Sequence, residues 1–217
     1  MTIINRPMDA GFFDLKLAVF LEWMGKSKKV LDLGCYDGRH SKLFLKGNND
    51  VYGVEILKKP AEAARKKGIK VKVLDLDRSK TWPFEDSFFD IVVAGDIVEH
   101  VLSTDNFFAN IHRILKKDGY LLISTPNIAS LGRRVMLLAG KNPYIEICSH
   151  DEVQGFPAIG HVRYFTHDSL KRLLTHYGMV VEKTATPPLY LGPFTNSLLG
   201  RLFPTLTWSI ILKARKL

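Results

Sequence analysis

Two aspartates accompany a pair of glycines near the N-terminal end of the chain. Asp32 lies within a short apolar run, Gly34 and Gly38 follow it, and Asp37 lies between the two glycines. Glycines here let the backbone approach a ligand where a Cβ atom would collide. A loop that binds pyrophosphate relies on bare N–H groups, whereas two carboxylates favour a ligand with positive charge or hydroxyl donors. Residues 30–40 therefore predict a small-molecule site at a strand–loop–helix turn.

Further acidic residues follow the next two apolar runs. Glu55 comes directly after the run at 51–54 and stands 21 positions after Gly34. Asp75 closes the following run. Each is either a charge at a strand end or a group that contacts a polar ligand, and the pattern leaves both interpretations open. Asp77 is typical of a loop residue that caps backbone groups or faces solvent.

Two carboxylates and an imidazole follow the apolar run at 91–94. If the turn after this run is helical, Asp96, Glu99 and His100 share one face, because they are spaced three and four positions apart. Such a trio suits a divalent metal or a general base. The alternative is that Glu99 and His100 form a hydrogen-bonded structural pair. We expect the structural pair and no metal ligand, with His100 and Asp96 as catalytic candidates.

The elements that must position these residues alternate between strands and helices. Apolar spacing predicts a leading helix over Phe12–Met24, which packs against the sheet or covers the site. The remaining predicted elements of the first part of the chain are strands at 30–33, 51–54, 71–74, 91–94 and 120–124 and helices at 40–45, 60–67 and 104–118. This alternation implies a parallel, doubly wound α/β sheet with right-handed crossovers and helices on both faces.

The residues after 127 follow a less regular pattern. The elements predicted there are a short basic helix at 129–139, a helix capped by Thr166, and two strands at 180–183 and 209–214 joined by a long loop. The basic helix either packs plainly or covers an apolar substrate or a membrane surface. We predict a single domain, 1–217, that divides into a core at 28–127, a substrate or lid insertion at 128–160, and a C-terminal helix and strand pair at 161–217.

Cys148, His150 and His161 lie close together in the irregular stretch at 142–163. A fourth zinc ligand is not evident and the spacing is irregular, so we expect ordinary substrate-loop residues. His161 is the third catalytic candidate, because its segment should return to the mouth of the cleft.

The bulk composition is that of a globular protein: 217 residues, 46% hydrophobic, 24% charged and a net charge of +9. Two cysteines cannot build a disulfide framework. No apolar run reaches the ~20 residues that span a bilayer, and the first residues lack a signal-peptide pattern, so we expect a cytoplasmic protein. The positive charge indicates solvated helix faces, an anionic substrate, an anionic membrane surface or nucleic acid, and charge alone does not choose among them.

Together these residues resemble the class I S-adenosylmethionine-dependent methyltransferases, and in particular the branch that includes ubiquinone-pathway enzymes. The resemblance is carried by the Asp-Leu-Gly-Cys-Tyr-Asp-Gly loop at 32–38, by Glu55, by Asp75-Leu76, and by the stretch Pro-Phe-Glu-Asp-Ser-Phe-Phe-Asp at 83–90 with Glu99-His100 after it. It implies a seven-stranded sheet with an antiparallel C-terminal strand. It also implies S-adenosyl-L-methionine as cofactor and S-adenosyl-L-homocysteine as product.

The resemblance assigns roles to individual residues. The first motif would hold the methionine part of the cofactor, Glu55 the ribose hydroxyls and Asp75 the adenine amino group. The full set of residues expected to bind the cofactor is Asp32, Gly34, Cys35, Tyr36, Asp37, Gly38, Glu55, Ile56, Asp75, Leu76 and Asp96. In the ubiquinone O-methyltransferases a trio like Asp96, Glu99 and His100 serves a metal. Tyr36 replaces a residue that is usually glycine, and we expect it to line the cofactor cleft.

The expected reaction is methyl transfer to a small-molecule acceptor, anionic or lipid-like, with O-methylation of a lipid, quinone precursor or glycan preferred. Peripheral membrane contact is open, and the oligomeric state is not predicted. Two other functions remain: a non-catalytic cofactor-binding protein and a nucleic-acid methyltransferase. The second is disfavoured because the residues after the fourth strand, Gly-Asp-Ile-Val at 95–98, lack the Asn/Asp-Pro-Pro-aromatic turn of amino-methyltransferases. A dinucleotide-binding dehydrogenase is also disfavoured, because Gly34 and Gly38 depart from the G-x-G-x-x-G spacing.

Overall fold

A computed structural model describes residues 12–143, 152–153, 156–157, 160–191 and 194–217. Its centre is a seven-stranded sheet. From one edge to the other the strands are β3 (Lys70–Val73), β2 (Asp50–Glu55), β1 (Lys29–Leu33), β4 (Phe89–Gly95), β5 (Leu115–Pro126), β11 (Ser209–Lys216) and β8 (Met179–Ala185). β11 is antiparallel to both of its neighbours, and the pairs from β3 to β5 are parallel. The predicted doubly wound sheet with an antiparallel C-terminal strand is confirmed.

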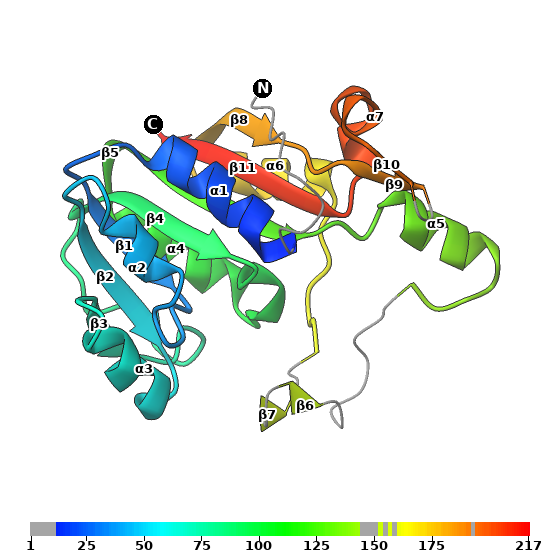
Figure 1. The fold of residues 1–217 in the computed structure, drawn as a ribbon. Coiled ribbons are helices and arrows are strands. Elements are labelled where there is room, and N and C mark those ends of the chain that lie inside the picture. Colours follow the sequence, from blue (N-terminus) through cyan, green and yellow to red (C-terminus); the bar gives the residue numbers. More distant parts are fainter. Residues whose placement is uncertain (1–11, 144–151, 154–155, 158–159, 192–193) are drawn as a thin grey trace.

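Helices cover both faces of the sheet (Figure 1). One face carries α1 (Phe12–Met24), α2 (Ser41–Phe44) and α3 (Lys58–Arg65), and the other carries α4 (Thr104–Ile114) and α6 (His167–His176). Successive residues of the central strands alternate between the two cores: Val30 packs toward α1, for example, and Leu31 packs toward α4. A strand that is buried on both faces is apolar throughout, which explains the continuous apolar runs of the sequence.

The helix ends follow from local sequence. Thr166 caps α6 by a reciprocal capping box with Ser169, as the sequence predicted for Thr166. Gly178 then ends this helix region with φ at +68°. At the start of α4, Ser103 is the N-cap residue and Thr104 is the first helical residue.

The structure corrects the boundary between α4 and β5. The sequence predicts a helix as far as Asp118, but α4 ends at Ile114 and β5 begins at once. Asp118 has φ at +61° inside β5, and the pairing with β4 shifts register between Phe89 and Ile91. The Asp-Gly pair is therefore an irregularity within a long strand. Asp118 has the left-handed backbone of a turn residue, and a Cβ atom on Gly119 would lie 2.9 Å from Lys116 O.

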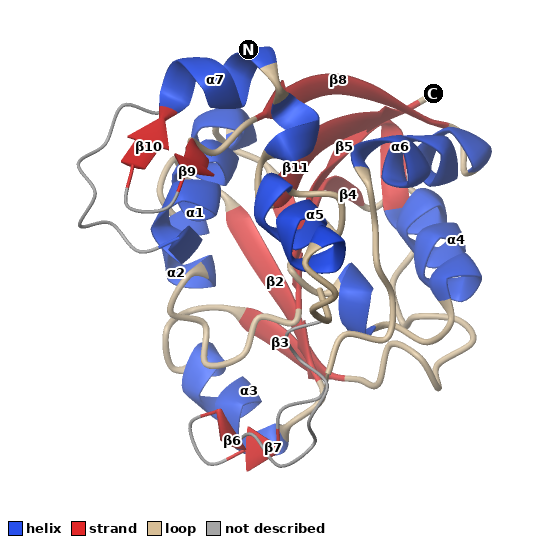
Figure 2. Cartoon of the chain, turned by 90° about the vertical axis from the view of Figure 1, so that its right-hand side faces the viewer, coloured by secondary structure: helices blue, strands red, loops and turns tan. Residues whose placement is uncertain are grey.

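Residues 127–208 add small elements outside the sheet. They are α5 (Leu131–Leu138), the short pair β6 (Glu152–Val153) and β7 (Phe156–Pro157), the hairpin β9 (Leu189–Leu191) and β10 (Phe194–Asn196), α7 (Ser197–Leu202) and the 3-10 helix η2 (Pro204–Leu206). Only α5 was predicted from sequence. Figure 2 shows α5, α7 and β10 on one side of the molecule, which faces the viewer. The division of the domain at residues 127 and 160 stays a prediction.

Among the helices that the structure describes, none has the length and apolar character needed to cross a membrane.

Candidate functional site

A cavity of about 530 Å³ opens beside the carboxyl ends of β1 and β4 and under α1. Its volume suits a small organic ligand. The lining residues are Lys16, Leu17, Phe20, Asp32, Leu33, Gly34, Cys35, Tyr36, Arg39, His40, Phe44, Val93, Gly95, Asp96 and Ser124. The leading helix thus both packs on the sheet, through Val19 and Phe20, and covers the site. Five of the expected cofactor-binding residues meet here: Asp32, Gly34, Cys35, Tyr36 and Asp96.

Asp32 is the most deeply placed carboxylate of this cavity. It is 8% exposed, and its Oδ2 accepts a hydrogen bond of 2.5 Å from Ser41 Oγ. Burial raises the pKa of Asp32 from 3.8 to about 7, although the Ser41 hydrogen bond opposes this rise. A positively charged ligand would restore the ordinary ionisation of this group, which fits the preference expected from its position in the loop.

Two glycines give the loop after β1 its shape. Gly34 has φ at +73°, and a Cβ atom on it would lie 2.5 Å from Ile97 Cδ1. Gly38 has φ at +75°, and its Cβ would lie 2.5 Å from Ile69 Cδ1 and 2.9 Å from Ala64 Cβ. Gly34 therefore brings the loop against the segment that follows β4, and Gly38 brings it against α3.

Tyr36 adopts the strained conformation that its position implied. Its φ is +48°, which costs about 1–2 kcal/mol for a residue with a side chain. The Tyr36 N–H donates to Glu55 Oε2 at 3.0 Å, and the Leu57 N–H donates to Glu55 Oε1 at 2.9 Å. Glu55 is itself only 7% exposed. The carboxylate at the end of β2 thus fixes the loop after β1, and Tyr36 lines the cavity.

Asp37 is not among the described residues that line the cavity. Its Oδ1 accepts hydrogen bonds from Arg39, and its Oδ2 lies 3.1 Å from Lys67 Nζ. Burial works to raise the pKa of Asp37, but the hydrogen bonds from Arg39 and Lys67 outweigh it and lower the pKa to about 2. Asp37 therefore anchors the loop to α3 in this structure.

Cys35 lies beneath the loop. It is 6% exposed, its N–H donates to Val54 O, and its Sγ would lie 2.6 Å from a Cβ on Gly53. Burial, and secondarily the charges of Asp32 and Glu55, raise the pKa of the Cys35 thiol far above its ordinary range. The thiol stays protonated, so Cys35 is a packing residue of the cavity wall rather than a nucleophile.

The residues expected to hold the adenosine end of the cofactor follow β2 and β3, one and two strands away from β1 in the sheet, and they are not among the described residues that line the cavity. Ile56 is 58% exposed, an apolar side chain open to solvent just after β2. Asp75 accepts hydrogen bonds from the backbone N–H groups of Asp77 and Arg78, and Leu76 packs against the core. Asp77 Oδ1 accepts from two backbone N–H groups before α4, at 2.9 and 3.0 Å. The expectation that Asp77 serves as a cap is confirmed.

Asp96 is held by α1, a contact that the sequence does not predict. Its Oδ2 lies 2.5 Å from Lys16 Nζ, and its Oδ1 accepts a hydrogen bond of 3.0 Å from Ser124 Oγ. Lys16 is on the buried side of α1, with Val19 and Phe20 three and four positions further on. A lysine at core spacing in α1 indicates a buried ammonium group that needs an acidic partner, but it does not identify Asp96 as that partner.

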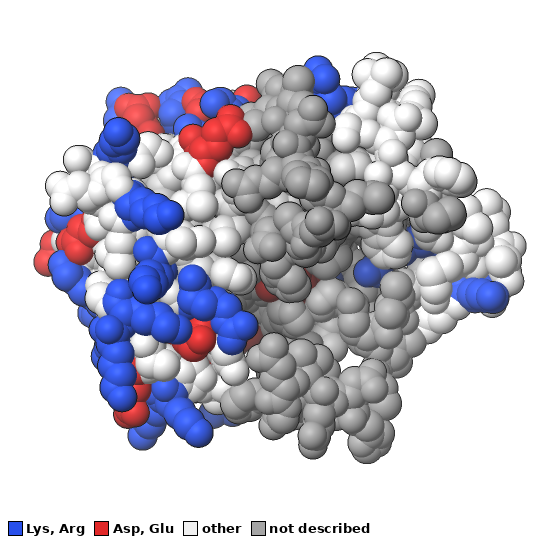
Figure 3. Space-filling view, viewed as in Figure 1, with Lys and Arg blue, Asp and Glu red and all other residues white. Residues whose placement is uncertain are grey.

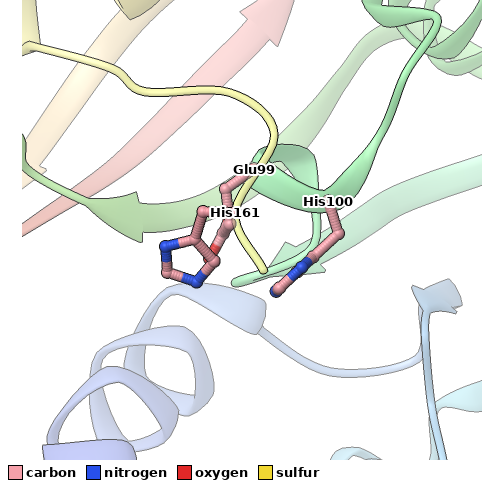
Figure 4. A group of neighbouring side chains, drawn as sticks. All are labelled: Glu99, His100 and His161. Atoms are coloured by element: carbon pink, nitrogen blue, oxygen red, sulfur yellow. The ribbon is translucent and has the colours of Figure 1, made fainter. Parts of the chain in front are cut away.

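The turn after β4 is a 3-10 helix, η1 (Val98–His100), rather than an α-helix. Glu99 is buried, and its Oε2 accepts a hydrogen bond from Thr125 Oγ1 at 2.9 Å. Burial, and then the nearby charge of Asp96, raise the pKa of Glu99 to about 8. His100 lies against His161, with ring centroids 4.8 Å apart (Figure 4).

His161 reaches this position because its segment is bonded to η1. The N–H groups of Val162 and Arg163 both donate to Glu99 O, at 2.9 and 3.0 Å. The structure therefore brings His161 to the turn after β4. Neither His100 nor His161 is among the described residues that line the cavity, so their contact with a substrate stays a prediction. Cys148 and His150 lie outside the described residues.

Most of the chain is similar to a known family of protein domains. Residues 6–184 match the model of a methyltransferase domain family. Over 132 residues the chain is 31% identical to a ubiquinone biosynthesis O-methyltransferase from Pelagibacter ubique; the match covers 58% of this chain and 54% of that protein. The chain spans about half the length of the curated relatives it matches.

Solved structures share the fold. The Burkholderia thailandensis 1,6-didemethyltoxoflavin-N1-methyltransferase, solved with S-adenosylhomocysteine, is similar at a TM-score of 0.64 and 18% identity, over 96% of this chain and 79% of that one. An S-adenosylmethionine-dependent methyltransferase from Methanosarcina mazei is similar at a TM-score of 0.67 and 17% identity, over 92% of this chain and 97% of that one.

Proposed function

The chain belongs to the class I S-adenosylmethionine-dependent methyltransferases, and from that premise we propose that it methylates a hydroxyl group of an apolar small molecule: a lipid, a quinone precursor or a glycan carried on a lipid. The observation that carries the proposal is the pair of imidazoles, His100 and His161, beside the cavity wall at Asp96. The curated relatives named as O-methyltransferases support the same choice of acceptor atom.

The residues of the cavity fit the cofactor. S-adenosylmethionine supplies an electrophilic sulfonium methyl group and leaves as S-adenosylhomocysteine. The cavity wall offers the buried carboxyl of Asp32 to a cationic ligand, and the missing Cβ of Gly34 keeps the backbone close to Ile97. We assign the methionine end of the cofactor to this loop, the ribose to Glu55 and the adenine to Ile56 and Asp75.

The acceptor side is formed by the segment after β4 and by the residues around His161. Transfer of a sulfonium methyl needs little covalent help, so the protein supplies mainly proximity and alignment. A hydroxyl acceptor must in addition lose its proton as the new bond forms. His100 and His161 are placed to activate that hydroxyl, because η1 and the His161 segment are joined by two backbone hydrogen bonds.

Exposed apolar side chains outside the sheet support an apolar acceptor. Large apolar side chains are exposed on the side of the molecule that carries α5, β10 and α7 (Figure 2). They are Val135, Leu137, Leu138, Phe194, Leu198, Leu202 and Phe203. In the view of Figure 3 lysine and arginine gather at the opposite end, over α2, α3 and β3, whereas the end with α5 and α7 is mostly uncharged. We propose that the uncharged end receives the acceptor and rests on a membrane surface.

Two experiments test this function. Transfer of labelled methyl from S-adenosylmethionine into fractionated cell extract should place the label in the lipid or small-molecule pool. Label in the nucleic-acid pool, or none in any pool while the cofactor binds, would contradict the proposed acceptor. Membrane contact is tested by co-sedimentation with lipid vesicles: Leu137→Asp and Leu138→Asp should reduce it, while Val180→Asp, an exposed apolar position on β8, should leave it unchanged.

His100→Ala separates catalysis from cofactor binding. The variant should bind S-adenosylhomocysteine as the wild type does and lose at least about tenfold in turnover. The matched control is His176→Ala, which removes a surface histidine of α6. If both variants turn over equally fast, His100 has no part in the reaction.

A further inference from the structure

Three potential metal ligands converge next to the cofactor cavity. Glu99 and His100 come from η1, and His161 comes from the loop that passes over it (Figure 4). One ligand atom from each residue lies within 4.8 Å of the other two. The residues are separated by about sixty positions in the sequence, so the fold itself brings the two segments together.

The carboxylate of Glu99 is incompletely satisfied. Its Oε2 accepts from Thr125 Oγ1, but its buried Oε1 has no hydrogen-bond partner among the described residues. A buried carboxylate oxygen without a donor or a cation is costly and therefore rare. An ion at this oxygen would supply the missing partner.

The cluster is also held in place. Glu99 O accepts from the N–H groups of Val162 and Arg163, directly after His161. Ligands on two clamped segments lose little conformational freedom when an ion binds, which favours binding.

Asp96 is not part of this cluster. Lys16 and Ser124 occupy both of its carboxylate oxygens, and the Asp96 backbone has φ at +49°. The trio that the family resemblance implied, Asp96 with Glu99 and His100, is thus not the one that the structure assembles. His161 takes the third place, and the donor set changes from two carboxylates and one imidazole to one carboxylate and two imidazoles.

We propose that Glu99, His100 and His161 bind a divalent first-row transition ion such as Zn²⁺, and not Mg²⁺. Imidazole suits zinc and its neighbours, whereas Mg²⁺ prefers oxygen ligands and keeps its waters. Ligand atoms about 2.1 Å from a tetrahedral ion lie about 3.4 Å from one another. The longest separation, 4.8 Å, must therefore shorten by about 1.4 Å, which rotation of a histidine side chain supplies.

Three protein ligands leave a coordination position open, as in catalytic zinc sites. This part of the inference rests on the proposed function: the open position takes the acceptor hydroxyl. A bound ion would lower the pKa of that hydroxyl, and the hydroxyl proton would pass to solvent before or during transfer. The methyl–sulfur bond then breaks as the methyl–oxygen bond forms, and the sulfonium becomes a thioether.

The test is metal binding by the chelator-treated full chain, measured by calorimetry with Zn²⁺ alone and with Mg²⁺ alone. The wild type should bind one Zn²⁺ at this site at least about 100-fold more tightly than Mg²⁺. Glu99→Gln and His161→Ala should each weaken Zn²⁺ binding at least about tenfold, while Asp96→Asn and His112→Ala, a histidine of α4, should leave it unchanged. Titration with Co²⁺ gives a second readout, since the visible bands of a four-coordinate site should vanish in the same two variants.

The possible results separate the metal site from the proposed function. Mg²⁺ binding that requires Asp96 but not His161 would overturn the inference in favour of the family's trio. Zn²⁺ binding that survives both Glu99→Gln and His161→Ala would place the ion elsewhere. Absence of Zn²⁺ binding in a chain that still binds S-adenosylhomocysteine would refute the metal site alone. Failure to bind S-adenosylhomocysteine would instead refute the proposed function.

Discussion

Replacing Lys16 by methionine should expose how much the fold depends on the ion pair at the cavity wall. Lys16 and Asp96 approach to 2.5 Å, and their side chains are only 7% and 15% exposed. Methionine keeps the length and the apolar stem of the lysine but removes the charge. Asp96 would then be left with the Ser124 hydroxyl as its described partner.

The structure sets the size of the effect. Removing one partner of a buried ion pair costs about 3–5 kcal/mol, because the other charge stays buried without compensation. Asp96 keeps a little access to the cavity, so we expect the lower end, about 3 kcal/mol. In a chain of this size, that corresponds to a fall in the melting temperature of about 6–12 °C.

The matched control is Arg172→Met. Arg172 pairs with Asp168 across one turn of α6, at 3.0 Å, with both side chains more than three-quarters exposed. Loss of such a pair costs only about 0.3–0.5 kcal/mol. The double variant Lys16→Met/Asp96→Asn removes both charges of the buried pair and should recover most of the lost stability.

Thermal and urea unfolding of these four proteins measure the effect directly. Equal losses in Lys16→Met and Arg172→Met would show that the pair at the cavity is as well solvated as the surface pair. Failure of the double variant to recover would show that Lys16 stabilises α1 through its packing and not through its charge.

Three further predictions follow from single residues. Asp77→Ala should lower the free energy of unfolding by about 1 kcal/mol, because the backbone cap is lost, but it should not change S-adenosylhomocysteine binding. Asp75→Ala should weaken that binding. Urea unfolding and calorimetry of both variants check this contrast, and weaker binding by Asp77→Ala than by Asp75→Ala would contradict it. Gly34→Ala should lose more stability than Gly25→Ala. Both glycines have positive φ, which costs an alanine about 1–2 kcal/mol, but only at Gly34 does the new Cβ meet a side chain, Ile97, at 2.5 Å, which adds about 1–3 kcal/mol. Equal melting temperatures of the two variants would refute this contact. Burial raises the pKa of Asp32 to about 7, so between about pH 4 and 7 the folded state keeps a proton that the unfolded state loses. The free energy of unfolding should therefore fall as pH rises, by up to about 1.4 kcal/mol per pH unit. The stability of Asp32→Asn relative to the wild type, both without cofactor, should grow over this range, and a constant difference would contradict the buried state of Asp32.

Most of the fold could be predicted because its central strands are buried on both faces. The runs that became β1, β2 and β4 are short, apolar and bounded by glycine or acidic residues, which leaves few alternatives. The start of β5 was missed since Asp118-Gly119 has the composition of a turn, yet pairing with β4 continues on both sides of it. Tertiary pairing outweighed the local signal at this point.

The site was predicted where residues act close to their own strand. Asp32, Gly34 and Tyr36 lie at the end of β1, so the sequence order places them together at the cavity. Asp37 was expected beside them, but its ion pair with Lys67 depends on the approach of the segment after α3, which spacing within the loop does not specify.

Contacts between distant segments were the hardest to foresee. Lys16 meets Asp96 across eighty positions, and nothing at either residue alone indicates the other. The hairpin β9–β10 and α7 were taken for a loop, because each is only a few residues long and their stability comes from packing against neighbours rather than from periodicity.

The measurement that tests the central claim most directly is calorimetric titration of S-adenosylhomocysteine into the wild type and Asp32→Ala, with folding of both checked by circular dichroism. The cavity between β1, β4 and α1 predicts one binding site per chain, with an affinity that falls at least about 100-fold in the variant, as expected when a charged partner is removed from a buried ligand contact. Equal affinity in the two proteins would contradict the assignment of the cofactor to this cavity, and no binding by the folded wild type would contradict the methyltransferase function itself.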